Sequence, residues 1–313
     1  MDSLSEVPLL SEPDRLTKLH QFIYTNVDFK SKSLQGMVQF TWAMALRSLS
    51  QLPGMTTSAA QLTEFDDSCL DLALENKAFD FCRNLLEAKA ITVDNELIIQ
   101  HLHKLFTDMI ILMPLKIKEL RKMSDATHWI SLAKLITQFY TTASGLGLHN
   151  EFWNAAVSQK TTHRCLALHD FLRIDMLPPQ LYVTTVNMLK ALSVGGDPSR
   201  ATFKLLRQAT GNLSWDRIFD SLREYCDNLR VELGLHGATR GVRMSPEESE
   251  AMIAVIDIAG SVCSFDSNAR QVMLEQQTWR VPLYLMQLLR CPIEPALKEL
   301  VLNITKKIKY ISI

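Results

Sequence analysis

Apolar residues recur along most of the chain at steps of three and four, the spacing that lines one face of an α-helix. Between Leu34 and Leu52 one such stripe holds Val38, Trp42, Ala45 and Leu49, and a second holds Met37, Phe40 and Met44. The two stripes lie about a quarter to a third of a turn apart, so this helix is apolar over more than half of its circumference. We therefore predict an interior helix that is covered on two sides.

Capping residues and helix breakers predict where several further helices begin and end. One helix is expected from Asp94, a candidate N-cap, through Leu112 until Pro114 interrupts it. Another should start after Ser214 and stop at Gly234. The run 245–248, Ser-Pro-Glu-Glu, is a capping box with proline at the first helical position, which predicts a third start. Glycines at 195–196 and at 211 indicate joins between helices.

The same pattern favours an all-α protein. No alternating run of β-branched residues bounded by hairpin turns occurs, so we predict no strand. Gly 11 and Pro 11 together make about 7% of the 313 residues, against roughly 12% in average proteins, which leaves few turn-formers for a many-stranded sheet. Leucine also greatly outnumbers valine, and valine loses side-chain freedom in a helix.

Roughly a dozen helices of ten to twenty residues with short connections can close into a globule or stack into a solenoid. Because several helices are apolar on two sides, we predict an elongated α-helical solenoid of HEAT/armadillo-like stacked helices. Residues 1–313 are expected to form a single segment of this solenoid without an internal domain boundary. No fixed repeat period can be read from the sequence.

The net charge and the lengths of the apolar runs limit the classes of function that the chain can have. Lys+Arg 33 against Asp+Glu 34 gives a formal charge of -1, which favours neither nucleic acid nor an anionic membrane surface as a partner. Apolar runs such as Met109–Met113 are far shorter than the roughly 20 residues of a transmembrane helix. The first residues lack the basic-then-apolar layout of a signal peptide. We expect an intracellular, soluble protein.

The candidate ligand residues do not converge on a site. His101 and His103 would lie about 200° apart on a helix, and His163 and His169 about 240°, so we interpret them as surface or packed histidines. Six separated cysteines are typical of reduced, buried thiols that bind no metal: Cys69, Cys82, Cys165, Cys226, Cys263 and Cys291. We assign no catalytic, cofactor-binding or metal-binding residue, no cofactor and no small-molecule substrate.

Other notable residues are best explained by structure. Gly145 to Gly147 is interpreted as a helix terminator, because no strand precedes it and no third glycine follows as in a dinucleotide loop. Trp42, Trp215 and Trp279 lie on apolar stripes, which predicts core packing. Two basic clusters are expected to be solvated faces, with contact to an acidic partner as the alternative. They are Lys116, Lys118, Arg121 and Lys122, and Lys306, Lys307 and Lys309.

Several segments carry more information than the spacing of their apolar residues. FTWAMALRSLSQLP at 40–53 resembles a segment of the nucleoporin 205 family, called nucleoporin 192 in fungi. Further segments resemble that family in the same order: LMPLKIKELR at 112–121, LPPQLYVTTVNMLKAL at 177–192, LSWDRIFDSL at 213–222, SNAR at 267–270 and CPIEPALK at 291–298. The resemblance covers the chain from about Leu34 to Leu302. Residues 123–133 and 161–171 look compact or divergent, and the ending KKIKYISI does not resemble the family's continuation.

This resemblance implies a non-enzymatic, structural α-solenoid in the inner ring of the nuclear pore complex, at the nuclear envelope. Such a scaffold supports pore assembly and, through it, transport of protein and RNA. The implied partners are other inner-ring and linker nucleoporins, bound through short peptide motifs; no partner-binding residue can be assigned. The alternative is a soluble helical-repeat transport receptor or cargo adaptor. Because family members are several times longer, we also expect the isolated chain to self-associate or fray at its ends.

Overall fold

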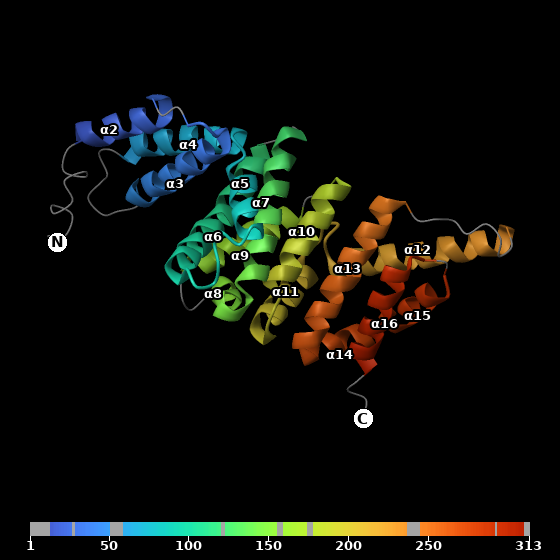
Figure 1. Ribbon diagram of the computed structural model, residues 1–313. Helices are drawn as coiled ribbons and strands as arrows, with labels where there is room; N and C mark the ends of the chain where they lie inside the picture. The colour runs from blue at the N-terminus through green and yellow to red at the C-terminus, as the bar shows by residue number, and fades with distance from the viewer. Residues whose placement is uncertain are drawn as a thin grey trace. The chain divides into compact units, whose positions relative to one another are not determined.

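The protein is described by a computed structural model that covers residues 13–26, 29–50, 59–119, 123–154, 159–173, 178–236, 245–291 and 293–309. Every regular element in these ranges is a helix, which confirms the predicted all-α class (Figure 1). In the same ranges, no helix is both long enough and apolar enough to span a bilayer. The chain divides into two compact units, Met1–Ile91 and Thr92–Ile313. The single solenoid segment over residues 1–313 stays a prediction.

The first unit is built around one central helix, α3. Its elements are α2 (Pro13–Gln21), the π-helical turn η1 (Phe22–Asn26), α3 (Lys32–Ser50), α4 (Ala59–Glu75) and α5 (Ala78–Glu87). Phe40 of α3 is buried and meets Phe79 of α5 edge to face, with ring centroids 5.4 Å apart. On another side, Trp42 packs against a cluster formed by Leu16 of α2 and Leu46. The predicted covering of this helix on two sides is confirmed.

The second unit contains the remaining helices in chain order (Figure 1). They are α6 (Glu96–Glu119), α7 (Met123–Thr142), the 3₁₀ turn η2 (Ser144–Leu146), α8 (Leu148–Trp153), α9 (Gln159–Leu172), α10 (Pro179–Leu192), α11 (Gly196–Gln208), α12 (Trp215–His236), α13 (Pro246–Phe265), α14 (Ser267–Glu275), α15 (Val281–Arg290) and α16 (Pro295–Lys309).

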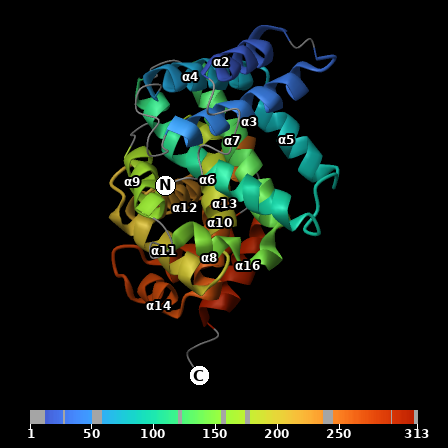
Figure 2. The same cartoon turned by 90° about the vertical axis from the view of Figure 1, so that its left-hand side faces the viewer.

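Within this unit, α7, α10, α13 and α16 form a row in which each helix packs on the helix three places earlier in the chain. α7 packs on α10, α10 on α13, and α13 on α16. Figure 2 looks along this row, so that α10 and α13 lie one behind the other. α10 and α13 run parallel, because Lys190 of α10 and its C-cap residue Ser193 contact Asp257 and Ser261 of α13 in the same order. The unit is therefore a solenoid of stacked helices, in agreement with the predicted HEAT/armadillo-like fold.

The spacing of these row contacts explains why no repeat period is visible in the sequence. Trp129 of α7 contacts Thr185 of α10, a separation of 56 residues. From α10 to α13 the separation is 67 residues, and from Ser249 of α13 to Glu294, just before α16, it is 45. Stacking thus repeats in space while the connecting segments change in length, so the sequence cannot repeat at a fixed interval.

Two predicted helix starts are confirmed. The Ser245 hydroxyl accepts from Glu248 N at 3.2 Å, and the Glu248 carboxylate accepts from Ser245 N at 2.9 Å, which completes the capping box of α13. The Ser214 hydroxyl likewise accepts from Arg217 N at 3.3 Å at the start of α12. The predicted joins are also present: Gly195 is the N-cap of α11, which begins at Gly196, and Gly211 lies between α11 and α12.

Three predicted helix limits were wrong. α6 begins at Glu96, so the residue just before the helix is Asn95 and not the predicted Asp94. The Asn95 side chain accepts a hydrogen bond from Thr92 N at 3.2 Å in the preceding turn. α6 then continues through Pro114 to Glu119, because a proline removes one backbone hydrogen bond and bends a helix without having to end it. α12 runs past Gly234 to His236, because one glycine lowers helix propensity by only about 1 kcal/mol.

Candidate functional site

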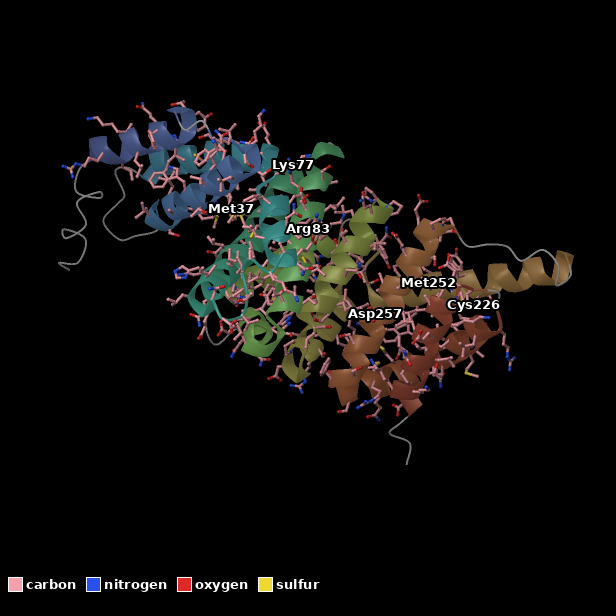
Figure 3. The ribbon with its side chains drawn as sticks, viewed as in Figure 1. Met37, Lys77, Arg83, Cys226, Met252 and Asp257 are labelled. Atoms are coloured by element: carbon pink, nitrogen blue, oxygen red, sulfur yellow. The ribbon has the colours of Figure 1, made fainter. Side chains whose placement is uncertain are left out.

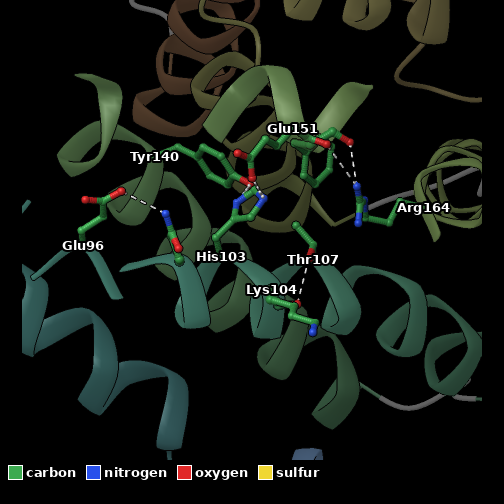
Figure 4. A network of polar contacts seen from close by, with 9 residues as sticks. Glu96, His103, Lys104, Thr107, Tyr140, Glu151 and Arg164 are labelled. Atoms are coloured by element: carbon green, nitrogen blue, oxygen red, sulfur yellow. Dashed lines mark hydrogen bonds and ion pairs between the residues drawn. The ribbon is translucent and has the colours of Figure 1, made fainter. Parts of the chain in front are cut away.

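Four helices of the second unit contribute residues to one polar network, in which His103, Tyr140 and Arg164 are buried and the Glu151 side chain is exposed (Figure 4). His103 comes from α6, Tyr140 from α7, Glu151 from α8 and Arg164 from α9. The Tyr140 hydroxyl lies 2.9 Å from His103 Nδ1, and Glu151 Oε2 lies 3.7 Å from His103 Nε2. Since a carboxylate can only accept, we assign the proton of His103 to Nε2, and Tyr140 then donates to Nδ1.

Burial fixes the protonation states of this pair. Desolvation, with contributions from the charges of Arg164 and His149, lowers the pKa of His103 to about 4. Desolvation also raises the pKa of Tyr140 well above its ordinary value. Both groups are therefore neutral at pH 7, and neither exchanges a proton near neutral pH as a general acid or base would. The pair is a fixed hydrogen bond between α6 and α7.

Arg164 joins α9 to the C-terminal end of α8. Its guanidinium donates to Phe152 O at 3.0 Å and to Glu151 O at 3.4 Å, and it lies 5.2 Å from the centroid of the Phe152 ring. The last carbonyls of a helix have no partner within the helix and carry a partial negative charge, which a cation satisfies. Arg164 thereby fixes the short helix α8 beside α9.

All five tryptophans use their indole N–H to join separate elements. The acceptors are His20 Nδ1 for Trp42 at 3.3 Å, Thr185 Oγ1 for Trp129 at 3.0 Å, Leu192 O for Trp153 at 2.9 Å, Phe203 O for Trp215 at 3.1 Å and Asp216 Oδ1 for Trp279 at 2.5 Å. Trp215 and Trp279 are buried and Trp42 is half-buried, so the predicted packing role of these three is confirmed. Each ring combines apolar burial with a directional bond.

A second polar seam joins α10 to α13. Lys190 forms an ion pair with Asp257, which Figure 3 labels on α13. Three residues further on, at the C-cap of α10, the Ser193 hydroxyl lies 3.0 Å from the Ser261 hydroxyl. Ser199 donates to Ser193 O at 2.5 Å and so brings the start of α11 to the same place. These contacts set the position of one row helix along the next.

The structure places the four singled-out histidines as predicted, on the surface or in packed positions. His101 is exposed and bonds within its own helix, with Nδ1 2.6 Å from Leu97 O, whereas His103 is buried in the polar network. His163 is exposed, and His169 Nε2 lies 3.4 Å from Gln208 O. Among the described residues, no three His, Cys, Asp or Glu side chains gather as a metal site requires.

The remaining candidates of the sequence are structural or surface residues. Gly147 has φ 71° between η2 and α8, a left-handed conformation that confirms a helix terminator at 145–147. Lys306 and Lys307 are exposed on α16, while the side chains of Lys309 and of the cluster at 116–122 lie outside the described residues.

None of the six cysteines, all of which lie in the described ranges, forms a disulfide. Cys165 is half-buried, and the other five are buried. Burial raises the pKa of Cys82 and of Cys263 to about 12, so these two thiols stay protonated at neutral pH and are poor nucleophiles.

Sequence reasoning missed Tyr140, Glu151 and Arg164. They lie on three helices, and their separations from His103 along the chain match no motif. Only the fold brings them together, because α6 packs on α7 and α9, and α8 lies beside α9.

A stack of helices whose buried polar groups serve to join its layers defines an α-helical scaffold. Residues 4–308 match the family described as "Nuclear pore complex scaffold, nucleoporins 186/192/205", and the chain belongs to this family. It is 28% identical to the nuclear pore complex protein Nup205 of Homo sapiens, over 95% of this chain and 17% of the human protein. It is 25% identical to the Nup205 of Drosophila melanogaster, over 96% of this chain and 16% of that protein. The chain thus spans about one sixth of each relative.

Proposed function

We propose that this chain is a structural scaffold nucleoporin of the inner ring of the nuclear pore complex. It supports pore assembly, and through it nucleocytoplasmic transport of protein and RNA, by binding other nucleoporins at the nuclear envelope. The observation that carries this proposal is the family match over residues 4–308, which takes in both compact units. The alternative of a soluble transport receptor or cargo adaptor finds no support, since both relatives are named as pore proteins.

The partners we propose are linker nucleoporins that contribute short peptide motifs. An amphipathic segment can lay its apolar face between neighbouring helices of a stack. The seam between α10 and α13 and the network across α6 to α9 support this mode, because they hold the helices at fixed positions. A surface that is already ordered loses little conformational entropy when a peptide binds.

We also infer that the chain acts by binding and not by catalysis. His103 and Tyr140 form the described buried pair that most resembles an acid–base couple. Both are neutral at pH 7, and the Tyr140 side chain is only 1% exposed, so a substrate has no access to its hydroxyl. A general acid or base must reach the proton that it transfers.

Crosslinking in isolated nuclear envelopes tests the proposal. The affinity-tagged 313-residue chain should form crosslinks with inner-ring nucleoporins, and these crosslinks should map to both compact units. A tagged helical-repeat protein of similar size and unrelated sequence provides the control. Recovery of a GTP-loaded small GTPase in place of any inner-ring component would favour the transport-receptor alternative and contradict the scaffold.

A further inference from the structure

The outer face of α16 carries an acidic, an apolar and a basic residue on one line. Glu299, Leu302 and Lys306 are all exposed and follow one another at steps of three and four, so they share one face of the helix. Leu302 is 47% exposed. The opposite face is buried, through Leu297, Val301, Ile304 and Ile308.

The charges at the two ends of this stripe are available for a partner. No described residue forms an ion pair with Glu299 or Lys306. The next lysine, Lys307, is also exposed but lies about 100° further around the helix than Lys306. The stripe of Glu299, Leu302 and Lys306 is therefore a charged and apolar surface without an intramolecular partner in the described part of the chain.

The order of the three residues makes the stripe complementary to itself. When two copies of α16 lie antiparallel, acid–apolar–base in one copy faces base–apolar–acid in the other. The midpoint between positions 299 and 306 falls half a residue from Leu302, which is about 0.75 Å along the helix axis. Each Glu299 then lies opposite Lys306 of the second copy, and the two Leu302 side chains meet beside the two-fold axis. A two-fold contact requires such self-complementarity.

We propose that the outer face of α16 binds a second copy of this chain in an antiparallel, two-fold contact. Two Glu299–Lys306 ion pairs flank a central contact between the Leu302 side chains. The formal charge of -1 imposes little repulsion between copies. A contact made by one helix from each copy is smaller than a standard stable interface, so the dissociation constant is expected between roughly 10 µM and 1 mM.

Sedimentation velocity of the full chain from about 1 to about 500 µM tests this contact by exchange of charges. E299K and K306E each place two pairs of like charges in the interface, and each should raise the dissociation constant at least about 10-fold. The double variant E299K/K306E restores opposite charges across the axis and should return to within about threefold of the unmodified chain. L302D places two carboxylates at the centre and should abolish the dimer.

Matched variants separate the contact from a general effect of charge. E224K on α12 and K204E on α11 make the same changes of net charge at other exposed positions and should leave the dissociation constant unchanged. Circular dichroism melts establish that each variant is folded. A chain that stays monomeric at all concentrations would overturn the proposal. So would a double variant that fails to recover, or a dimer that resists L302D and dissociates only with L283D/M286D on α15.

Discussion

Individual buried polar side chains in this molecule join helices that are distant in sequence. Tyr140 and His103 are 37 residues apart and Trp129 and Thr185 are 56 apart, yet both pairs are buried and hydrogen-bonded. A buried polar group that loses its partner costs about 1–3 kcal/mol, so these bonds penalise helix arrangements in which the partners do not meet. At this scale the polar groups select one arrangement of the stack.

The protonation of His103 predicts a loss of stability in mild acid. The imidazole titrates near 6.5 in an unfolded chain and has a pKa of about 4 in the fold. Between these values the unfolded state binds more protons, so the free energy of unfolding falls as the pH falls. From pH 7 to pH 5 the expected loss from His103 is about 2 kcal/mol. His20 and His149, whose pKa values burial also lowers, act in the same direction.

Urea unfolding at pH 7 and pH 5 measures this loss. H103Q retains an acceptor for Tyr140 but cannot be protonated in this range, so it should lose about 2 kcal/mol less than the unmodified chain between the two pH values. H163Q changes an exposed histidine and should behave as the unmodified chain does. Equal losses of unfolding free energy for H103Q and the unmodified chain would show that the pKa of His103 is the same in the folded and the unfolded state.

Thr185 should be needed as an acceptor for Trp129. T185V preserves the shape of a fully buried side chain but leaves the indole N–H without its partner, and should lower the free energy of unfolding by about 1–3 kcal/mol. T137V on α7 removes a hydroxyl that bonds only a carbonyl of its own helix, and should cost less than about 1 kcal/mol. Similar losses for the two variants in chemical unfolding would argue against the interhelical bond.

At the scale of helices, stacking depends on close approach at particular joins. A Cβ on Gly211, between α11 and α12, would lie 2.2 Å from Leu172 O at the end of α9. Only a glycine fits there, because backbone atoms cannot move aside as a flexible side chain can. In the row itself, a Cβ on Gly260 of α13 would lie 2.6 Å from Ile304 Cγ1 of α16.

G211A should therefore destabilise the chain by about 2–4 kcal/mol, because the added methyl group forces the α11–α12 connection away from α9. G145A serves as the control, since nothing lies within 4 Å of its Cβ, and its effect should stay within about 0.5 kcal/mol. Thermal melts of both variants compare the two directly. An unchanged melting temperature for G211A would show that the connection can be displaced without cost.

The sequence predicted that the helices form more accurately than it predicted where they begin and end or which residues they contact. Helix starts with their own hydrogen-bond signal, such as Ser245 and Ser214, could be predicted because the interaction is local. The continuation of α6 through Pro114 could not, since it depends on the residues on both sides supporting the helix. His103 was recognised as surface or packed, but its partner Tyr140 was not, because the contact arises only when α6 and α7 pack.

At the scale of the molecule, the family match and the near-zero charge have separate consequences. The match over residues 4–308 spans both compact units, so both belong to the part of the chain that matches the family. The formal charge of -1 and the isoelectric point near 6.7 leave little electrostatic repulsion between copies at neutral pH. Copies that repel one another weakly associate more readily.

Solubility should therefore pass through a minimum close to pH 6.7 and rise by pH 8.5, where the chain carries a clear negative charge. Turbidity of the concentrated chain, measured from pH 6 to pH 9 at low salt, checks this. Added salt should flatten the profile, because it screens the repulsion that keeps copies apart at pH 8.5. A minimum more than about two pH units away would mean that buried charges dominate the net charge.

The proposed function requires that these 313 residues be recruited to the nuclear pore. Imaging the fluorescently tagged chain in living cells, with the fluorescent tag alone as control, tests it most directly. The account predicts a punctate rim at the nuclear envelope that coincides with a pore marker. A signal spread evenly through the cell, indistinguishable from that of the tag alone, would contradict it.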